Sequence, residues 1–397
     1  MMAVKYSSLA EGFKDSELGA ILKLAEQPEV ISFAGGLPAP ELFPIEEMKQ
    51  VDVEILEKEG RKALQYGAAE GYEPLRQWIA ERMDSRYQVK TSTEEILMVS
   101  GSQQGLDILG RVFCDKNDIV LMESPSYLGA INAFKLSGPT FMEVPTDEEG
   151  MIPEALDKIL TEQSRVKMIY VIPDFQNPTG ITWSLERRKA FMEVITRHEI
   201  PVIEDNPYGD LRYEGEFLPS LKSMDTKGLV IFSGTFSKIF APGLRLGWLC
   251  ADKDIINKCD IMRQSMDLQT ASFAQRQAYY FVKNYDLEAH IKKIREVYKK
   301  RCHCMIAAME RYFPKEVSFT RPDGGLFAWV VLPEYINATE MLPVCLKQNV
   351  AYVPGACFYP NGGHANTFRL NYSNMNEERI EEGIRRLAEV IKAEMTK

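Results

Sequence analysis

The chain lacks long hydrophobic runs, paired cysteine motifs and clustered histidines. No stretch of its 397 residues approaches the roughly 18 apolar residues of a membrane span, and residues 1–11 lack the apolar core of a signal peptide. The seven cysteines are odd in number and have no CxxC spacing, and the four histidines form no HExxH pair. We therefore expect neither a membrane partner, a disulfide framework nor a metal site, and we expect a cytoplasmic protein with reduced thiols.

The charge balance is acidic. The formal net charge is -10, which argues against non-specific binding to nucleic acid. The length allows two domains, each with a large core.

Short apolar segments alternate with helical patterns from about residue 94 onward. Strands are predicted at 96–99, 119–122, 168–172, 202–203, 229–232 and 244–250, and helices at 102–113, 127–136, 153–160 and 184–198. This alternation predicts an α/β fold with a mostly parallel sheet covered on both faces.

The two ends of the chain have a different pattern. A short helical pattern at 16–25 precedes an irregular glycine- and proline-rich stretch, whereas residues 287–312 form a long helical pattern with a charge lattice. Beyond it, strands are predicted at 317–321, 325–332, 351–358 and 367–372, and a final helix at 376–395. We expect an N-terminal segment at 1–45, a large domain at 46–285, and a connector helix with a small α+β domain at 286–397.

The segment 233–247 is the most informative one. Lys238 stands beside the hydroxyl residues Ser233, Thr235 and Ser237, and Arg245 follows seven residues later. Apolar strands on both sides place Lys238 in a turn between buried segments, an unusual place for a surface lysine. A lysine amine can form a Schiff base with the aldehyde of pyridoxal 5'-phosphate (PLP), while hydroxyls and a guanidinium hold its phosphate.

Other polar residues follow the ends of predicted strands, where open α/β sheets bind ligands. Ser102 and Gln103 open a helix after a glycine turn, which suits a phosphate but is also common as a simple helix cap. Asn177 follows the strand at 168–172. Asp205 follows the strand at 202–203, where it can either pair with a protonated pyridine nitrogen or cap a helix.

Three further side chains are candidates for the same site. Tyr208 lies one turn after Asp205 and can reach a ring hydroxyl, and Tyr127 can either stack on a cofactor ring or fill the core. Arg369 lies in an apolar strand, where its planar fork suits a ligand carboxylate unless it faces solvent.

In this order, the motifs resemble those of fold type I PLP-dependent aminotransferases. The resemblance extends from Ile31 to Leu370 and is strongest to the subgroup of 2-aminoadipate and kynurenine aminotransferases and to the catalytic domains of MocR-type regulators. It implies a mostly parallel seven-stranded sheet in the large domain. It also implies a homodimer, in which Tyr66 reaches the phosphate of the neighbouring subunit's site.

The resemblance assigns a role to each candidate. Lys238 carries the cofactor and moves the proton, Asp205 pairs with the ring nitrogen, and Arg369 with Asn177 binds the substrate carboxylate. Gly36 lies against the substrate. The remaining cofactor contacts are Tyr208 and Asn177 at the ring oxygen, Tyr127 on the ring face, and Ser102, Gln103, Thr235, Ser237 and Arg245 at the phosphate.

One departure from the family concerns the substrate. Relatives that act on acidic substrates often have an arginine in the first helix, in a pattern like Ser-x-Ile-Arg, whereas this chain has Gly19 there and no arginine in residues 1–60. Lys23 could replace that arginine, or the space at Gly19 could admit aromatic or bulky aliphatic side chains.

The expected activity is transfer of an amino group from an L-amino acid to a 2-oxo acid such as 2-oxoglutarate, by a ping-pong mechanism. The donor is aromatic, aliphatic or similar to 2-aminoadipate. A PLP-dependent carbon–sulfur β-lyase or decarboxylase is the alternative, because such enzymes use the same cofactor contacts. A PLP-domain transcriptional regulator is a third possibility, which the acidic charge and the early start of the pattern disfavour.

Overall fold

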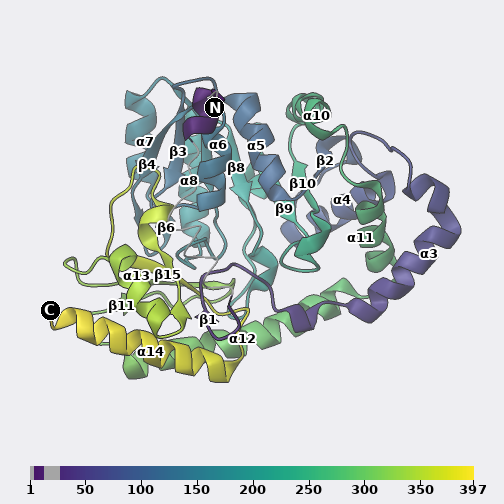
Figure 1. The fold of residues 1–397 in the computed structure, drawn as a ribbon. Helices are drawn as coiled ribbons and strands as arrows, with labels where there is room; N and C mark the ends of the chain where they lie inside the picture. The colour runs from purple at the N-terminus through teal and green to yellow at the C-terminus, as the bar shows by residue number, and fades with distance from the viewer. Residues whose placement is uncertain (1–3, 13–26) are drawn as a thin grey trace.

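The computed structural model describes residues 4–12 and 27–397 and is organised around two sheets (Figure 1). The large sheet has the strand order β2-β10-β9-β8-β7-β3-β4, and only β10 runs antiparallel to its neighbours. Its strands are β2 (Ile96–Val99), β3 (Ile119–Glu123), β4 (Thr140–Val144), β7 (Val166–Val171), β8 (Val202–Asp205), β9 (Val230–Thr235) and β10 (Gly247–Cys250). The predicted seven-stranded, mostly parallel sheet is confirmed.

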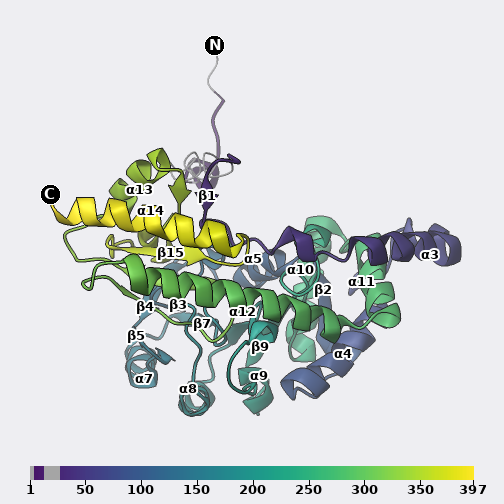
Figure 2. The ribbon, with the colours of Figure 1, turned by 90° about the horizontal axis from the view of Figure 1, so that it is seen from below.

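Both faces of the large sheet are buried. Along β3, Val120 and Met122 join one apolar core while Ile119 and Leu121 join another, as the two-residue period of a strand requires. Helices α5 (Ser102–Phe113) and α6 (Leu128–Lys135) cover the first face. Helices α7 (Pro153–Glu162), α8 (Leu185–His198) and α9 (Leu221–Met224) form a row along the second (Figure 2).

Four more helices extend the first core away from the sheet. They are α3 (Ile45–Ala63), α4 (Glu73–Tyr87), α10 (Lys253–Asp267) and α11 (Ser272–Asn284), and α3 packs on α11 at one end of the molecule (Figures 1 and 2). The sequence analysis placed none of these four helices.

The C-terminal part forms its own layer. An antiparallel sheet has the order β11-β12-β15-β14, from Ser318–Phe319, Phe327–Val331, Thr367–Asn371 and Val353–Pro354. Helices α12 (Leu287–Tyr312) and α14 (Glu377–Met395) lie side by side beneath it (Figure 2), and α13 (Ala338–Lys347) packs on α14. The N-terminal strand β1 (Ile31–Ser32) pairs with β13 (Val350–Ala351), which ties the start of the described chain to this layer. Apart from short 3₁₀ turns, the described residues also form α1 (Ser8–Gly12) and the hairpin of β5 (Thr146–Asp147) and β6 (Gly150–Met151).

Most predicted elements are present with bounds shifted by a few residues. The strand predicted at 244–250 begins only at Gly247, because Pro242–Leu244 form a 3₁₀ turn and Arg245 is left-handed. The edge strand β4 was missed, since only two of its five residues are buried and Thr140 and Glu143 interrupt any apolar run. The helix predicted at 16–25, with Gly19 and Lys23, lies outside the described residues.

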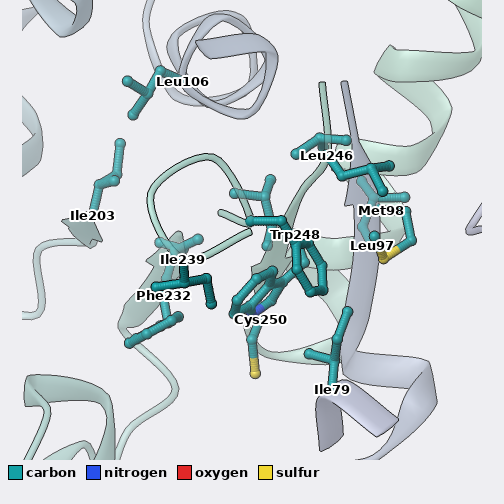
Figure 3. Packing of buried hydrophobic residues seen from close by; sticks show 14 of the residues in the cluster. Ile79, Leu97, Met98, Leu106, Ile203, Phe232, Ile239, Leu246, Trp248 and Cys250 are labelled. Atoms are coloured by element: carbon teal, nitrogen blue, oxygen red, sulfur yellow. The ribbon is translucent and has the colours of Figure 1, made fainter. Parts of the chain in front are cut away.

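The loop between β9 and β10 rests on a packed aromatic core. Trp248 lies among Phe232, Ile239 and Leu246 (Figure 3), and its ring centroid is 5.3 Å from that of Phe236. Gly234 faces the Trp248 ring so closely that a Cβ would collide with it. The loop between β9 and β10, which contains Lys238, therefore packs on tightly packed side chains that cannot shift easily. Within the described part of the chain, no helix is both long and apolar enough to span a bilayer.

Candidate active site

A cavity of about 440 Å³ lies where the carboxyl ends of the large sheet's strands meet the small sheet. Loops that follow five strands contribute to its wall, as expected for an open α/β sheet. The structure brings together these predicted residues: Gly36, Ser102, Gln103, Tyr127, Asn177, Asp205, Tyr208, Thr235, Ser237, Lys238, Arg245 and Arg369. Two do not join them: Tyr66 lies outside the cavity and is 77% exposed, and Gly19 falls outside the described residues.

Lys238 lies in the loop after β9, directly over the aromatic core. Its Nζ donates to the carbonyl oxygen of Gly36 at 2.8 Å. Burial, and then the positive charges of Arg369 and Arg245, lower the pKa of Lys238 to about 8. An amine with this pKa is partly unprotonated near neutral pH and so can act as a nucleophile or a base.

Asp205 is the last residue of β8 and is almost fully buried. Its Oδ2 accepts a hydrogen bond from the hydroxyl of Tyr170 at 2.7 Å, whereas Oδ1 has no hydrogen-bond partner among the described residues. Burial raises the pKa of this carboxyl to about 6. A buried carboxylate oxygen without a partner is costly, and a cationic ligand group would remove that cost.

A chain of hydrogen bonds crosses the cavity wall. The Asn177 amide donates to the Tyr208 hydroxyl at 3.3 Å, and its Oδ1 accepts from Arg369 at 2.7 Å. Arg369 also donates to the carbonyl of Ala34 at 2.7 Å. The single amide of Asn177 therefore fixes both a phenol and a guanidinium.

Two aromatic rings enclose the guanidinium of Arg369. Its carbon lies 4.2 Å from the ring centroid of Phe327 and 5.0 Å from that of Phe358. Burial lowers the pKa of Arg369 to about 10, and its Nε has no partner among the described residues. The arrangement keeps a desolvated cation ready for an anionic ligand.

The other end of the cavity holds an anion-binding set of groups. Ser102 is the first residue of α5, so its backbone N–H lies at the positive end of the helix. The Thr235 hydroxyl donates to the Ser237 Oγ at 3.0 Å, and Arg245 lies against Gly101, where a Cβ would collide with the guanidinium. Gly101 has a φ of +79°, so the close approach and the backbone both require glycine there.

The side-chain amide of Gln103 is already engaged within the protein. Its amide donates to the carbonyl of Gly129 at 2.7 Å and so links the start of α5 to α6. Tyr127 is the residue just before α6, makes no capping hydrogen bond with its side chain, and lines the cavity. The end of its ring lies so close to Gly129 that a Cβ there would collide with it.

These residues fit PLP. The described cavity wall carries three cations, Lys238, Arg245 and Arg369, against the single carboxylate of Asp205, so it favours a ligand with negative charge. The hydroxyls and helix start suit a phosphate at one end. The unpartnered Oδ1 of Asp205 suits a protonated ring nitrogen at the other.

Sequence reasoning missed several cavity contacts. Phe327 and Phe358 line the cavity but belong to apolar segments whose pattern does not distinguish a cavity wall from a core. Tyr170 in β7 was missed for the same reason, although it does not line the cavity and reaches the site through its hydrogen bond to Asp205. The carbonyl of Ala34 leaves no signal in a side-chain pattern.

Comparisons with known proteins agree with this geometry. Residues 29–387 match the family model described as aminotransferase class I and II. Aromatic-amino-acid aminotransferase 1 of Thermococcus litoralis is 46% identical, over 99% of this chain and 95% of its own. The 2-aminoadipate transaminase of Thermus thermophilus is 41% identical, over 95% of this chain and 94% of its own. A crystal structure of the Pyrococcus horikoshii kynurenine aminotransferase, in complex with PMP, superposes with a TM-score of 0.95 at 44% identity and covers 98% of this chain and 97% of its own.

Proposed function

The chain belongs to the class I and II aminotransferases and transaminates amino acids with PLP, and we propose that its preferred donor is an L-amino acid with an aromatic or bulky apolar side chain. The acceptor is a 2-oxo acid, and the two half-reactions alternate at one site. The bound cofactor supplies an electron sink for the electron pair released at the substrate Cα.

The preference for an apolar donor rests on the charges of the cavity wall. Of the three cations on its described part, Lys238 is needed for the cofactor, Arg245 lies at the phosphate end, and Arg369 takes the α-carboxylate. None is left for a second carboxylate on the side chain. The other side chains beside Arg369, apart from Asn177, are instead the apolar Phe327, Phe358 and Val353, and Leu37 adds a further apolar group to the cavity wall. The names of the Thermococcus and Pyrococcus relatives support the same substrate class.

The chain's own residues would share the work as follows. Lys238 holds the cofactor and moves the proton at the substrate Cα, aided by its lowered pKa. Asp205 faces the ring nitrogen, and Arg369 with Asn177 orients the α-carboxylate. The other contacts are Tyr208 and Asn177 at the ring oxygen, Tyr127 on the ring face, Gly36 beside the substrate, and Ser102, Gln103, Thr235, Ser237 and Arg245 at the phosphate.

A half-reaction screen tests this proposal. Holoenzyme is mixed with single amino acids while loss of the absorbance of the lysine-bound cofactor is followed. Phenylalanine, tyrosine, kynurenine and leucine should convert it readily, and 2-aminoadipate and glutamate poorly. The Lys238→Ala variant is the control, because it should neither show that absorbance nor turn over.

Two outcomes would overturn the proposed donor or reaction. Fast conversion by 2-aminoadipate or glutamate would mean that another cation binds a distal carboxylate. Release of pyruvate and ammonia from cystathionine without a 2-oxo acid, with no conversion by any amino acid, would favour the β-lyase alternative.

The homodimer is part of the proposal and is supported by an exposed apolar patch. Leu64, Tyr66 and Leu268 are 75%, 77% and 59% exposed. The two turns that carry them adjoin, since the Gly67 N–H donates to Gln269. Asp267, in the second turn, accepts hydrogen bonds from Ser100 at 3.3 Å and from Gln104 at 2.6 Å, on either side of Ser102. A second copy that covers this patch would lie next to the phosphate end of the cavity.

Subunit complementation tests the dimer. The Tyr66→Ala and Lys238→Ala proteins should each be inactive or weakly active. When the two proteins are mixed, unfolded and refolded together, turnover should return. A hybrid dimer with one subunit of each kind has one site in which both Tyr66 and Lys238 are intact. Sedimentation as a monomer, or a mixture no more active than its parts, would refute the shared site.

All seven cysteines are free, which supports the proposed cytoplasmic location.

A further inference from the structure

Tyr170 is a buried side chain with a direct contact to the site. It lies on β7, is fully buried, and donates its hydroxyl to Oδ2 of Asp205 at 2.7 Å. We propose that Tyr170 is a positioning residue, which fixes the Asp205 carboxylate so that its Oδ1 faces the ring nitrogen of the cofactor. This inference rests on the role proposed above for Asp205.

The strand register explains how the two side chains meet. Tyr170 pairs with Ile203 on the neighbouring strand, and Asp205 lies two residues further along the same face. A tyrosine is long enough to span this diagonal, whereas most side chains are not. The ring of Tyr170 packs edge-on against Phe134 of α6, with centroids 5.6 Å apart, so it has little freedom to turn away.

The kind of partner matters as much as its position. Asp210, five residues further on, is held by Arg82 at 2.9 Å, by Arg86 at 2.8 Å and by Tyr87, and its charge is balanced by the two arginines. The described side chains that act on Asp205 are uncharged hydroxyls: Tyr170, which donates to Oδ2, and the neighbouring Ser233, which also lowers the pKa of the carboxyl. A hydroxyl orients a carboxylate without neutralising it, so Asp205 keeps its demand for a cation. An arginine in place of Tyr170 would have satisfied that demand within the protein.

Because the Tyr170 hydroxyl binds Oδ2 of Asp205, the other carboxylate oxygen, Oδ1, is the one available to a ligand. A carboxylate held at one oxygen by a fixed phenol cannot rotate about its terminal bond without losing that hydrogen bond. Oδ1 has no partner among the described residues, and Asp205 lines the cavity. The pair therefore presents one free carboxylate oxygen in a fixed direction.

The Tyr170→Phe variant tests this, with Tyr352→Phe as its matched control. Tyr352 is equally buried and donates its hydroxyl to the Ala338 carbonyl at 2.6 Å, but it lies in the core of the small sheet. Tyr170→Phe should weaken cofactor affinity about tenfold to a hundredfold, the size expected for one hydrogen bond to a charged group. It should also lower the protonated fraction of the ring nitrogen, measured by ¹⁵N NMR of labelled cofactor. Tyr352→Phe should change neither quantity.

A double variant separates action through Asp205 from a general effect. In an Asp205→Asn background, Tyr170→Phe should add little to the loss of affinity, because both substitutions remove the same arrangement. Additive losses, or a Tyr170→Phe protein with unchanged affinity and an unchanged ¹⁵N shift, would overturn the inference alone. If Asp205→Asn by itself leaves both quantities unchanged, the role proposed for Asp205 fails instead.

Discussion

Glu204 and Asp205 are adjacent at the end of β8 and both are buried, yet they face opposite sides of the sheet and differ in what surrounds them. The two oxygens of Glu204 accept backbone N–H groups of Leu221 at 2.9 Å and Lys222 at 2.8 Å. Asp205 has one oxygen bound by Tyr170 and the other without a partner among the described residues. Burial raises the pKa of both carboxyls, to about 7 for Glu204 and about 6 for Asp205.

The difference lies in the partners, because burial is nearly the same. Glu204 completes the hydrogen bonding of a short helix start and so stabilises the fold. Among the residues that the structure describes, none binds the second oxygen of Asp205, and a ligand can supply that partner. A carboxylate at a strand end is therefore informative about function only once its hydrogen-bond partners are known.

The largest effect should come from Asp205→Asn. We expect kcat/KM to fall about a thousandfold, since breaking a buried charge pair costs roughly 3–5 kcal/mol. The thermal midpoint of the cofactor-free protein should not fall and should rise somewhat, because the substitution removes a buried charge that no cation among the described residues balances. Steady-state kinetics measure kcat/KM and calorimetry measures the thermal midpoint. Turnover like that of the wild type would contradict the proposal that Asp205, unlike Glu204, serves the cofactor.

Glu204→Gln should have the opposite pattern. The amide NH₂ of glutamine would face one of the two backbone donors, so one hydrogen bond is lost and the unfolding free energy should fall by about 1–3 kcal/mol. Activity should stay within a fewfold of the wild type. Chemical denaturation measures the unfolding free energy, and the half-reaction measures the activity. A large loss of activity with normal stability would show that Glu204 and Asp205 do not differ in role.

The smallest effect is a pH dependence of stability. In the folded protein Glu204 has a pKa of about 7, above its ordinary value of 4.5, so the fold binds this proton more tightly than the unfolded chain does. That contribution is complete below the ordinary value and is lost as pH rises through about 7, by at most about 1.4 kcal/mol per pH unit for one carboxyl. The thermal midpoint of the cofactor-free protein should decline over this window, and less steeply in Glu204→Gln. Equal slopes would exclude Glu204 as the titrating group.

The sequence predicted the alternating elements because β2, β3 and β9 are apolar runs bounded by polar turns. It missed β4, an edge strand with half-exposed residues, and α4, whose buried face includes Arg82 among apolar residues. The burial that makes Arg82 possible comes from Asp210, 128 residues away, and no local pattern records it.

The candidate site was predictable where residues follow strand ends, since the topology brings such positions together. Tyr170 was not, because a tyrosine in an apolar strand has the same pattern whether its hydroxyl meets a carboxylate or water. The roles of the site residues and the domain limits at 45 and 285 stay predictions. Tyr66 and Gly19 differ from the rest, because one depends on a second copy and the other lies outside the described residues.

The hydrogen bond from Arg369 to the carbonyl of Ala34 has a consequence for substrate binding. The carbonyl already occupies one of the N–H donors of this guanidinium, so the loop competes weakly with an incoming carboxylate for that donor. Substrate binding at this point is then an exchange, in which a full negative charge replaces a carbonyl dipole. Molecules without a carboxylate gain nothing from that exchange, so the competition itself selects for acids.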